Sequence, residues 1–143
     1  MLKLTKKADY GLIALRHLAV APAGNAASAK EIAEAYGIPL PLLSKVLQKL
    51  VRGGLMASVQ GTNGGYKLAR DPKEITALEA IRAIDGPIIL TSCFTSHKGC
   101  DQSVKCSVRE PLRKVHERIL AVLESTTISE MAEEAPVRLT VLK

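Results

Sequence analysis

Aromatic residues and long apolar segments are scarce in this sequence. It contains no Trp, one Phe and three Tyr, so its core must be built from Leu, Ile, Val and Ala, as in many helical proteins. No apolar run approaches the roughly 20 residues that span a bilayer, and the charged, interrupted N-terminus lacks the apolar segment of a signal peptide. We therefore expect a small, mainly α-helical, cytoplasmic protein without a membrane partner.

Enzyme motifs are missing as well. The sequence has no P-loop, no Gly-x-Ser-x-Gly motif and no metalloprotease motif. Its 143 residues, 47% of them hydrophobic, suit one small domain with an appendage rather than two independent domains. We expect neither enzymatic activity nor a small-molecule substrate.

Charge is unevenly distributed along the chain. Residues 1–73 hold 11 Lys and Arg against 4 Asp and Glu, a net charge of +7, whereas residues 74–143 hold 9 against 10, a net charge of −1. This asymmetry is typical of a nucleic-acid-binding half attached to a nearly neutral assembly or sensing half. A basic half that binds an acidic protein partner is the alternative.

Apolar periodicity and capping residues predict a winged helix-turn-helix in the first half. Ser28 and Glu31 can form a capping box before the second helix, and Pro41 suits the first turn of the third. We expect helices over residues 5–20, 29–36 and 41–52, then strand-like runs over 55–59 and 65–69 around the glycine-rich segment 60–64. This order of elements is that of a winged helix-turn-helix.

Two further capping boxes predict helices in the second half. Thr76–Glu79 opens a helix that stops at Asp85-Gly86-Pro87, and Ser107–Glu110 precedes a long helix that runs to about Leu123. The long helix carries an apolar stripe of Leu112, Val115, Ile119 and Val122. We interpret it as a homodimerisation helix; the alternative is a core helix within one subunit, but few elements remain to cover the stripe.

The sequence therefore divides into four regions. We predict a DNA-binding winged helix-turn-helix over residues 1–86, a cysteine-bearing loop over 87–106, the dimerisation helix with a short following helix over 107–131, and a tail over 132–143.

Side chains for both parts of DNA recognition are present. The second helix of a helix-turn-helix presents its early residues to base edges in the major groove. The residues so placed here are Leu42, Ser44, Lys45 and Gln48. Gln48 can recognise adenine, Ser44 can bond several bases, and Leu42 can contact a thymine methyl. We expect further contacts to phosphates and to the minor groove from Lys6, Lys7, Ser28, Lys30, Lys49, Gln60, Gly61 and Asn63. A winged helix used only for protein contacts is the alternative.

All three cysteines lie in one short segment, Cys93-x6-Cys100-x5-Cys106. In a reducing compartment, an odd number of clustered cysteines argues against a disulfide framework and for metal ligation or redox chemistry. Cys106 directly precedes the Ser107 helix start, where the helix dipole favours the thiolate. Iron–sulfur ligation, zinc binding, thiol oxidation and three thiols without a role all remain open at this point.

Several segments together resemble the BadM/IscR/NsrR-type transcriptional regulators, especially the branch that controls Suf-type iron–sulfur cluster assembly. The matching segments are Leu4-Thr-Lys-Lys-Ala-Asp-Tyr10-Gly-Leu, Glu31-Ile-Ala-Glu, Gly37-Ile-Pro, Leu42-Leu-Ser-Lys-Val-Leu-Gln-Lys-Leu50, Gly54-Leu and Gly61-Thr-Asn-Gly-Gly-Tyr66. The resemblance covers about residues 1–131. It implies a homodimer on double-stranded promoter DNA, with Cys93, Cys100 and Cys106 holding an iron–sulfur cluster, [2Fe–2S] rather than [4Fe–4S].

The sequence departs from the family pattern at two positions. Members that sense cluster supply often have a histidine ligand three residues after the last cysteine, where this sequence has Arg109. This leaves the fourth ligand open. Nitric-oxide-sensing relatives take an N-terminal aspartate from the partner subunit, and Asp9 matches that place, so the resemblance makes Asp9 the leading candidate for the fourth ligand. Many relatives have an arginine at the position of Gln60, so weaker minor-groove attraction is expected.

His97 and His116 are also available as nitrogen ligands. Two alternatives to a cluster-sensing regulator remain. One is an iron–sulfur carrier or redox protein, and the other is a cluster-free regulator that responds to thiol oxidation or to a small ligand.

Overall fold

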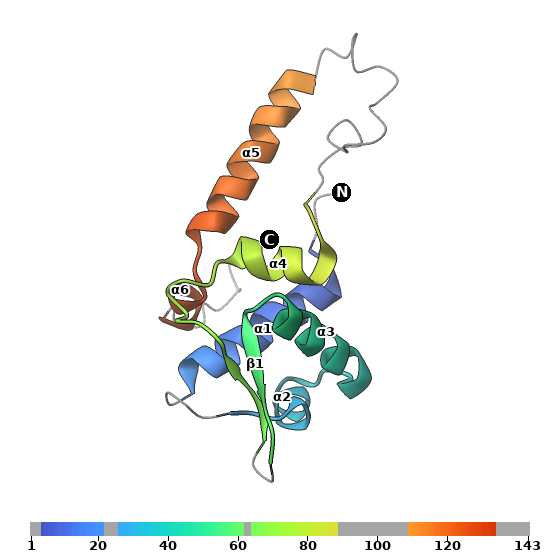
Figure 1. The fold of residues 1–143 in the computed structure, drawn as a ribbon. Helices are drawn as coiled ribbons and strands as arrows, with labels where there is room; N and C mark the ends of the chain where they lie inside the picture. The colour runs from blue at the N-terminus through green and yellow to red at the C-terminus, as the bar shows by residue number, and fades with distance from the viewer. Residues whose placement is uncertain (1–3, 22–25, 62–63, 89–108, 134–143) are drawn as a thin grey trace, which may run out of the picture.

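The structure, a computed structural model, describes residues 4–21, 26–61, 64–88 and 109–133. Its elements are α1 (Lys6–Val20), α2 (Ala29–Tyr36), α3 (Leu40–Arg52), β1 (Met56–Val59), β2 (Gly65–Leu68), α4 (Ala77–Asp85), α5 (Arg109–Ser125) and α6 (Ile128–Glu133) (Figure 1). This order confirms the predicted fold class, a mainly helical protein with one hairpin. The last short helix extends two residues past 131, into the predicted tail.

Hydroxyl side chains cap three helices. Thr5, Ser28 and Thr76 accept hydrogen bonds from the backbone N–H groups of Ala8, Glu31 and Glu79, at 3.0, 3.0 and 3.1 Å. Each cap satisfies one of the N–H groups that a helix start leaves without a partner. The second bond of a capping box, from the cap N–H to the glutamate carboxylate, forms neither at Ser28 nor at Thr76; the Glu79 carboxylate accepts from Arg70 instead.

The core of the winged helix-turn-helix lies between α1, α2 and α3. Leu15 of α1, Ile32 of α2 and Leu47 of α3 are fully buried there. On α3 the buried positions are Leu43, Val46, Leu47 and Leu50, as the apolar periodicity predicts. Full burial of each such side chain stabilises the fold by about 1.5–3 kcal/mol, so this core fixes the orientation of α3.

The hairpin forms the wing. β1 pairs with β2 in antiparallel register, with Met56 opposite Leu68 and Val59 opposite Gly65. Tyr66 in β2 also exchanges two backbone hydrogen bonds with Ala27, at 2.7 and 3.0 Å. These bonds tie the wing to the segment before α2, beside which the hairpin projects (Figure 1).

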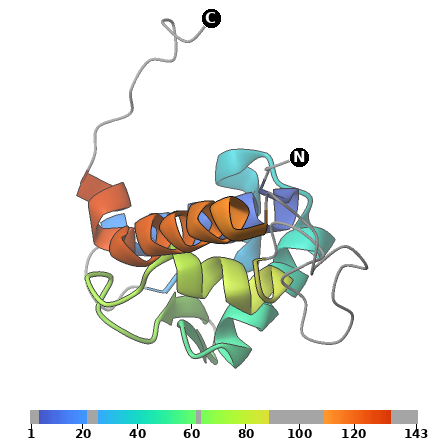
Figure 2. The ribbon, with the colours of Figure 1, turned by 90° about the horizontal axis from the view of Figure 1, so that it is seen from above.

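The long helix α5 joins the body at its C-terminal end. The Ala77 N–H at the start of α4 donates to the Thr126 carbonyl at 2.9 Å, and the Ile128 N–H donates to the Ile75 carbonyl at the same distance. The short α6 that follows packs against α1, where the Arg16 side chain donates to the Met131 carbonyl at 3.0 Å. From this anchor α5 passes alongside α4 (Figure 2) and extends beyond the other described elements (Figure 1).

None of the helices in the described residues is long and apolar enough to cross a bilayer.

Candidate nucleic-acid interface and sensing segment

The early residues of α3 provide the candidate base-reading surface. Lys45 and Gln48 are exposed, whereas Leu42 and Ser44 are half-buried. Buried leucines on the opposite side of α3 pack into the core, so the outer side of the helix presents an amide, an ammonium and a hydroxyl. These groups can donate to base edges or phosphates.

Lys49, which was expected on the same polar flank, lies differently. It is half-buried, and its Nζ donates to the Ile84 carbonyl at 3.1 Å. That carbonyl belongs to the last turn of α4, where carbonyl groups lack helical partners and the helix dipole attracts a cation. This bond uses one of the three N–H groups of the ammonium and orients the Lys49 side chain towards α4.

The other candidate phosphate contacts surround α3. Lys6 and Lys7 are exposed on the first turn of α1, and Lys30 is exposed on the first turn of α2. Ser28 is half-buried, and its oxygen already accepts the hydrogen bond that caps α2. The Ser28 hydroxyl keeps its proton and one lone pair for a contact with DNA.

The tip of the wing follows β1. Gln60 and Gly61 are exposed there, and Gly61 has a φ of 118°, which favours glycine. Asn63 lies outside the described residues. Gly65, at the start of β2, permits a close backbone approach to the chain's own Ala27. A Cβ at Gly65 would stand 2.4 Å from the Ala27 carbonyl oxygen.

The cysteine segment connects α4 to α5. Cys93, Cys100 and Cys106 lie outside the described residues, as do His97 and Ser107. Within the described ranges no three His, Cys, Asp or Glu side chains gather as a metal site would require. His116, the remaining candidate nitrogen ligand, is half-buried on α5.

Asp9 sits on the first turn of α1 and is half-buried. Among the described residues, no hydrogen bond or ion pair engages its carboxylate. The same end of α1 is joined to the end of α4, because Thr5 Oγ1 donates to Asp85 Oδ2 at 2.5 Å. Asp9 therefore lies near the point where the chain leaves α4 towards Cys93.

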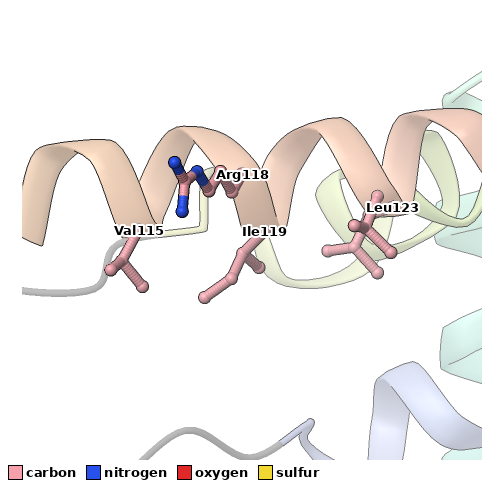
Figure 3. Close-up of a pocket in the computed structure, with 5 residues that line it drawn as sticks. Val115, Arg118, Ile119 and Leu123 are labelled. Atoms are coloured by element: carbon pink, nitrogen blue, oxygen red, sulfur yellow. The ribbon is translucent and has the colours of Figure 1, made fainter.

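The apolar stripe on α5 is largely uncovered. Val115 is 42% exposed and Val122 is 62% exposed, while Leu112 and Ile119 are half-buried. A shallow apolar groove of about 300 Å³ is lined by Val115, Arg118, Ile119, Val122 and Leu123. Figure 3 shows Val115, Ile119 and Leu123 projecting from one side of the helix. This apolar strip suits contact with another molecule.

Ion pairs lie away from that groove. Arg113 pairs with Glu110 and Glu117, at positions that helical periodicity places on the opposite side of α5. The hydrogen bond with the Glu110 carboxylate raises the pKa of the Arg113 guanidinium above its usual value. One side of α5 is therefore charged and solvated, and the other is apolar apart from Arg118.

An ion pair at the base of the wing was not predicted. Arg70, just after β2, contacts the Glu79 carboxylate at 2.5 Å and donates to the Glu74 carbonyl at 2.7 Å. The hydrogen bond with Glu79 raises the pKa of the Arg70 guanidinium. Nothing local in the sequence pairs these residues; the Thr5 cap, in contrast, was detectable as a threonine before the first helix.

Comparison with known proteins decides the family. Rrf2, described as an iron-dependent transcriptional regulator, matches residues 4–134. This chain belongs to the Rrf2 family. Its match covers the winged helix-turn-helix, the cysteine segment and both C-terminal helices, and it confirms the resemblance found in the sequence. The protein is a DNA-binding transcriptional regulator, in a family of regulators rather than enzymes.

This protein is also similar to solved structures of other regulators. CymR of B. subtilis, the global cysteine regulator, is 30% identical, with a TM-score of 0.78 over 95% of this chain and 100% of that chain. IscR of T. potens is 32% identical, with a TM-score of 0.71 over 95% of this chain and 94% of that chain. The oxidized form of CymR from Staphylococcus aureus is 27% identical, with a TM-score of 0.75 over 95% and 100% of the two chains.

Proposed function

We propose that this Rrf2 protein is a homodimeric, cytoplasmic regulator that reports iron–sulfur status to promoter DNA. Its signal enters through an iron–sulfur cluster on Cys93, Cys100 and Cys106, with Asp9 of the partner subunit as fourth ligand. The genes it controls are those for iron–sulfur cluster assembly, and nitric oxide or redox change acts on the same cluster.

One observation carries this proposal. In the sequence, the three cysteines fall between α4 and α5. Helix α4 packs against α1 and α3 of the winged helix-turn-helix, and the apolar side of α5 is uncovered. A ligand bound by that segment acts on the DNA-binding elements and on the candidate dimer helix at once.

The donor set fits an iron–sulfur cluster. Thiolate sulfur is the preferred ligand of cluster iron, and three cysteines within a 14-residue segment can surround one centre at little loop-closure cost. The fourth position needs a donor with no other role, and the Asp9 carboxylate has no hydrogen-bond or ion-pair partner among the described residues. When bound, the cluster supplies redox and ligand-exchange chemistry.

DNA binding and dimerisation are carried out by side chains of the protein. Lys6, Lys7 and Lys30 hold the phosphates, and Lys45 and Gln48 face the base edges from α3. The groove of α5 packs on the same surface of a second copy, as a two-fold dimer requires. Regulation then consists of a difference in DNA affinity between loaded and cluster-free dimers, since only such a difference can shift promoter occupancy.

The direct test is purification without oxygen. We expect a coloured protein with iron and acid-labile sulfide in equal amounts per subunit. A Cys93→Ser, Cys100→Ser, Cys106→Ser variant should be colourless, with the same helical circular dichroism spectrum. A wild-type protein that stays colourless after reconstitution with iron and sulfide would refute the cluster.

A second candidate is a cluster-free regulator that responds to thiol oxidation. The likeness to CymR, a cysteine regulator whose oxidized form has been solved in Staphylococcus aureus, favours it. In that case a colourless protein would lose or gain DNA affinity on mild oxidation, and the triple serine variant would not. Zinc in the colourless protein would instead indicate a zinc site.

A further inference from the structure

The last turn of α4 is held by the two helices that flank it. On one side, Thr5 at the start of α1 donates to the Asp85 carboxylate. On the other, Lys49 of α3 donates to the Ile84 carbonyl at 3.1 Å. The recognition helix therefore contacts the last turn of α4 directly, through a side chain and not only through core packing.

The backbones of α3 and α4 also approach each other closely at this end. A Cβ added at Gly53, which ends α3, would stand 2.9 Å from the Cβ of Ala83. Lys49 lies one turn before Gly53, so the ammonium and the glycine contact together fix the C-terminal half of α3 against α4.

Lys45 provides a contrast on the same helix. It lies one turn before Lys49, is exposed, and has no hydrogen bond or ion pair among the described residues. Lys49 is half-buried and oriented towards α4 rather than solvent. The two lysines are therefore placed for different tasks, Lys45 to meet DNA and Lys49 to hold α4.

Helix α4 is the last helix of the winged helix-turn-helix region before the cysteine segment. After Asp85 the chain continues through Gly86–Ile88 into residues 89–108, the segment that holds all three cysteines. Within the described residues, the Lys49–Ile84 hydrogen bond is a direct polar link between the end of α4 and the recognition helix.

We propose that Lys49 is a positioning residue that couples the end of α4 to the recognition helix, rather than a phosphate contact. The idea that Lys49 transmits a signal rests on the proposed sensing function. The position of Lys49 in the fold does not depend on it. When the last turn of α4 moves, the hydrogen bond to Ile84 changes and α3 is re-aimed in the major groove. By reciprocity, DNA binding must alter the end of α4.

The first test is the salt dependence of DNA binding by the cluster-free protein. The probe is a duplex that the wild-type protein selects from a random-sequence pool. Each phosphate contact contributes about 0.9 to the slope of log Kd against log salt. We expect Lys30→Met, which removes a phosphate contact of the proposed interface, to lower the slope by about one contact and Lys49→Met to leave it unchanged. A slope lowered equally by Lys49→Met would overturn the proposal.

The second test is coupling, measured on the same duplex. In the wild type we expect the ratio of loaded to cluster-free Kd values to differ from one, and Lys49→Met to bring it closer to one by roughly 5-fold to 10-fold. Lys49→Arg keeps a cationic donor and should retain most of the ratio, as should Lys45→Met. If Lys49→Met keeps the wild-type ratio, Lys49 is not a coupling residue.

A third measurement separates this inference from the sensing function. The Gly86 amide donates to the Arg82 carbonyl at 2.9 Å and reports on the end of α4. In the cluster-free protein, DNA binding should change the hydrogen exchange of this amide in the wild type and in Lys49→Arg, but not in Lys49→Met. A wild-type Kd ratio of one would defeat cluster sensing alone. An unchanged response of Gly86 in Lys49→Met would defeat the coupling role.

Discussion

Gly65 and Ala27 are in direct backbone contact, and this contact attaches the wing to the helix-turn-helix. A Cβ at Gly65 would lie 2.4 Å from the Ala27 carbonyl oxygen and 2.8 Å from the Ser28 nitrogen. The neighbouring Tyr66 exchanges both of its backbone hydrogen bonds with Ala27. Only glycine fits at position 65 without separating β2 from the start of α2.

Gly65→Ala should therefore destabilise the protein. The added methyl group meets backbone atoms, which cannot rotate away, and overpacking of this kind costs about 1–3 kcal/mol. Urea unfolding followed by circular dichroism should show a free energy of unfolding lower by about 2 kcal/mol. Ser58→Ala, at an exposed position of β1, should change it by less than about 0.5 kcal/mol. Equal stability of the two variants would contradict the contact.

Thr5→Ala should lower stability through two lost hydrogen bonds. The Thr5 hydroxyl caps α1 and donates to Asp85 at the end of α4. Loss of a helix cap costs about 1 kcal/mol, and the contact with Asp85 adds to that loss. Thr5→Ser keeps the hydroxyl, so its melting temperature should stay near that of the wild type. If serine and alanine melt alike, the hydroxyl is not what holds the two helices.

Val122→Glu should weaken the dimer. Val122 is 62% exposed in one subunit and borders the apolar groove of α5, so a carboxylate there would be desolvated in the dimer contact. Sedimentation equilibrium should show a dimer dissociation constant raised by about 10-fold or more. Ala121→Glu adds the same charge at the adjacent exposed position, outside the groove, and should leave the constant nearly unchanged. A Val122→Glu protein that dimerises as the wild type does would place the interface elsewhere.

Asp9→Ala should reduce cluster retention without unfolding the protein. Its carboxylate has no hydrogen-bond or ion-pair partner among the described residues, so the free energy of unfolding should change by less than about 0.5 kcal/mol. Iron and sulfide per subunit, measured after timed exposure to air, should fall faster than in the wild type. Glu34→Ala, at an exposed acid on α2, is the matched control. Identical loss in all three proteins would remove Asp9 as a ligand.

Local sequence signals predicted the elements well. Ser28 and Thr76 do cap α2 and α4, and the apolar positions of α3 are buried, because caps and helical periodicity involve residues only three or four apart. The family resemblance, confirmed by the Rrf2 match, supplied the DNA-binding function. The base-reading, phosphate, cluster and dimer residues stay predictions.

The contacts between distant residues were not predictable in the same way. Lys49 meets Ile84 across 35 positions of sequence, and Thr5 meets Asp85 across 80. Periodicity showed that Lys49 lies on the polar flank of α3, but polarity alone does not distinguish a carbonyl of α4 from a DNA phosphate as its partner. Only the packing of α3 against α4 makes that distinction.

The affinity for promoter DNA with and without the cluster tests the central claim most directly. Fluorescence anisotropy under anaerobic conditions would give Kd values for loaded and cluster-free protein on the duplex selected by the wild type. We expect them to differ by about 5-fold to 150-fold. The triple Cys93→Ser, Cys100→Ser, Cys106→Ser variant should bind as the cluster-free protein does. Equal affinities of loaded and cluster-free protein would contradict regulation through a cluster.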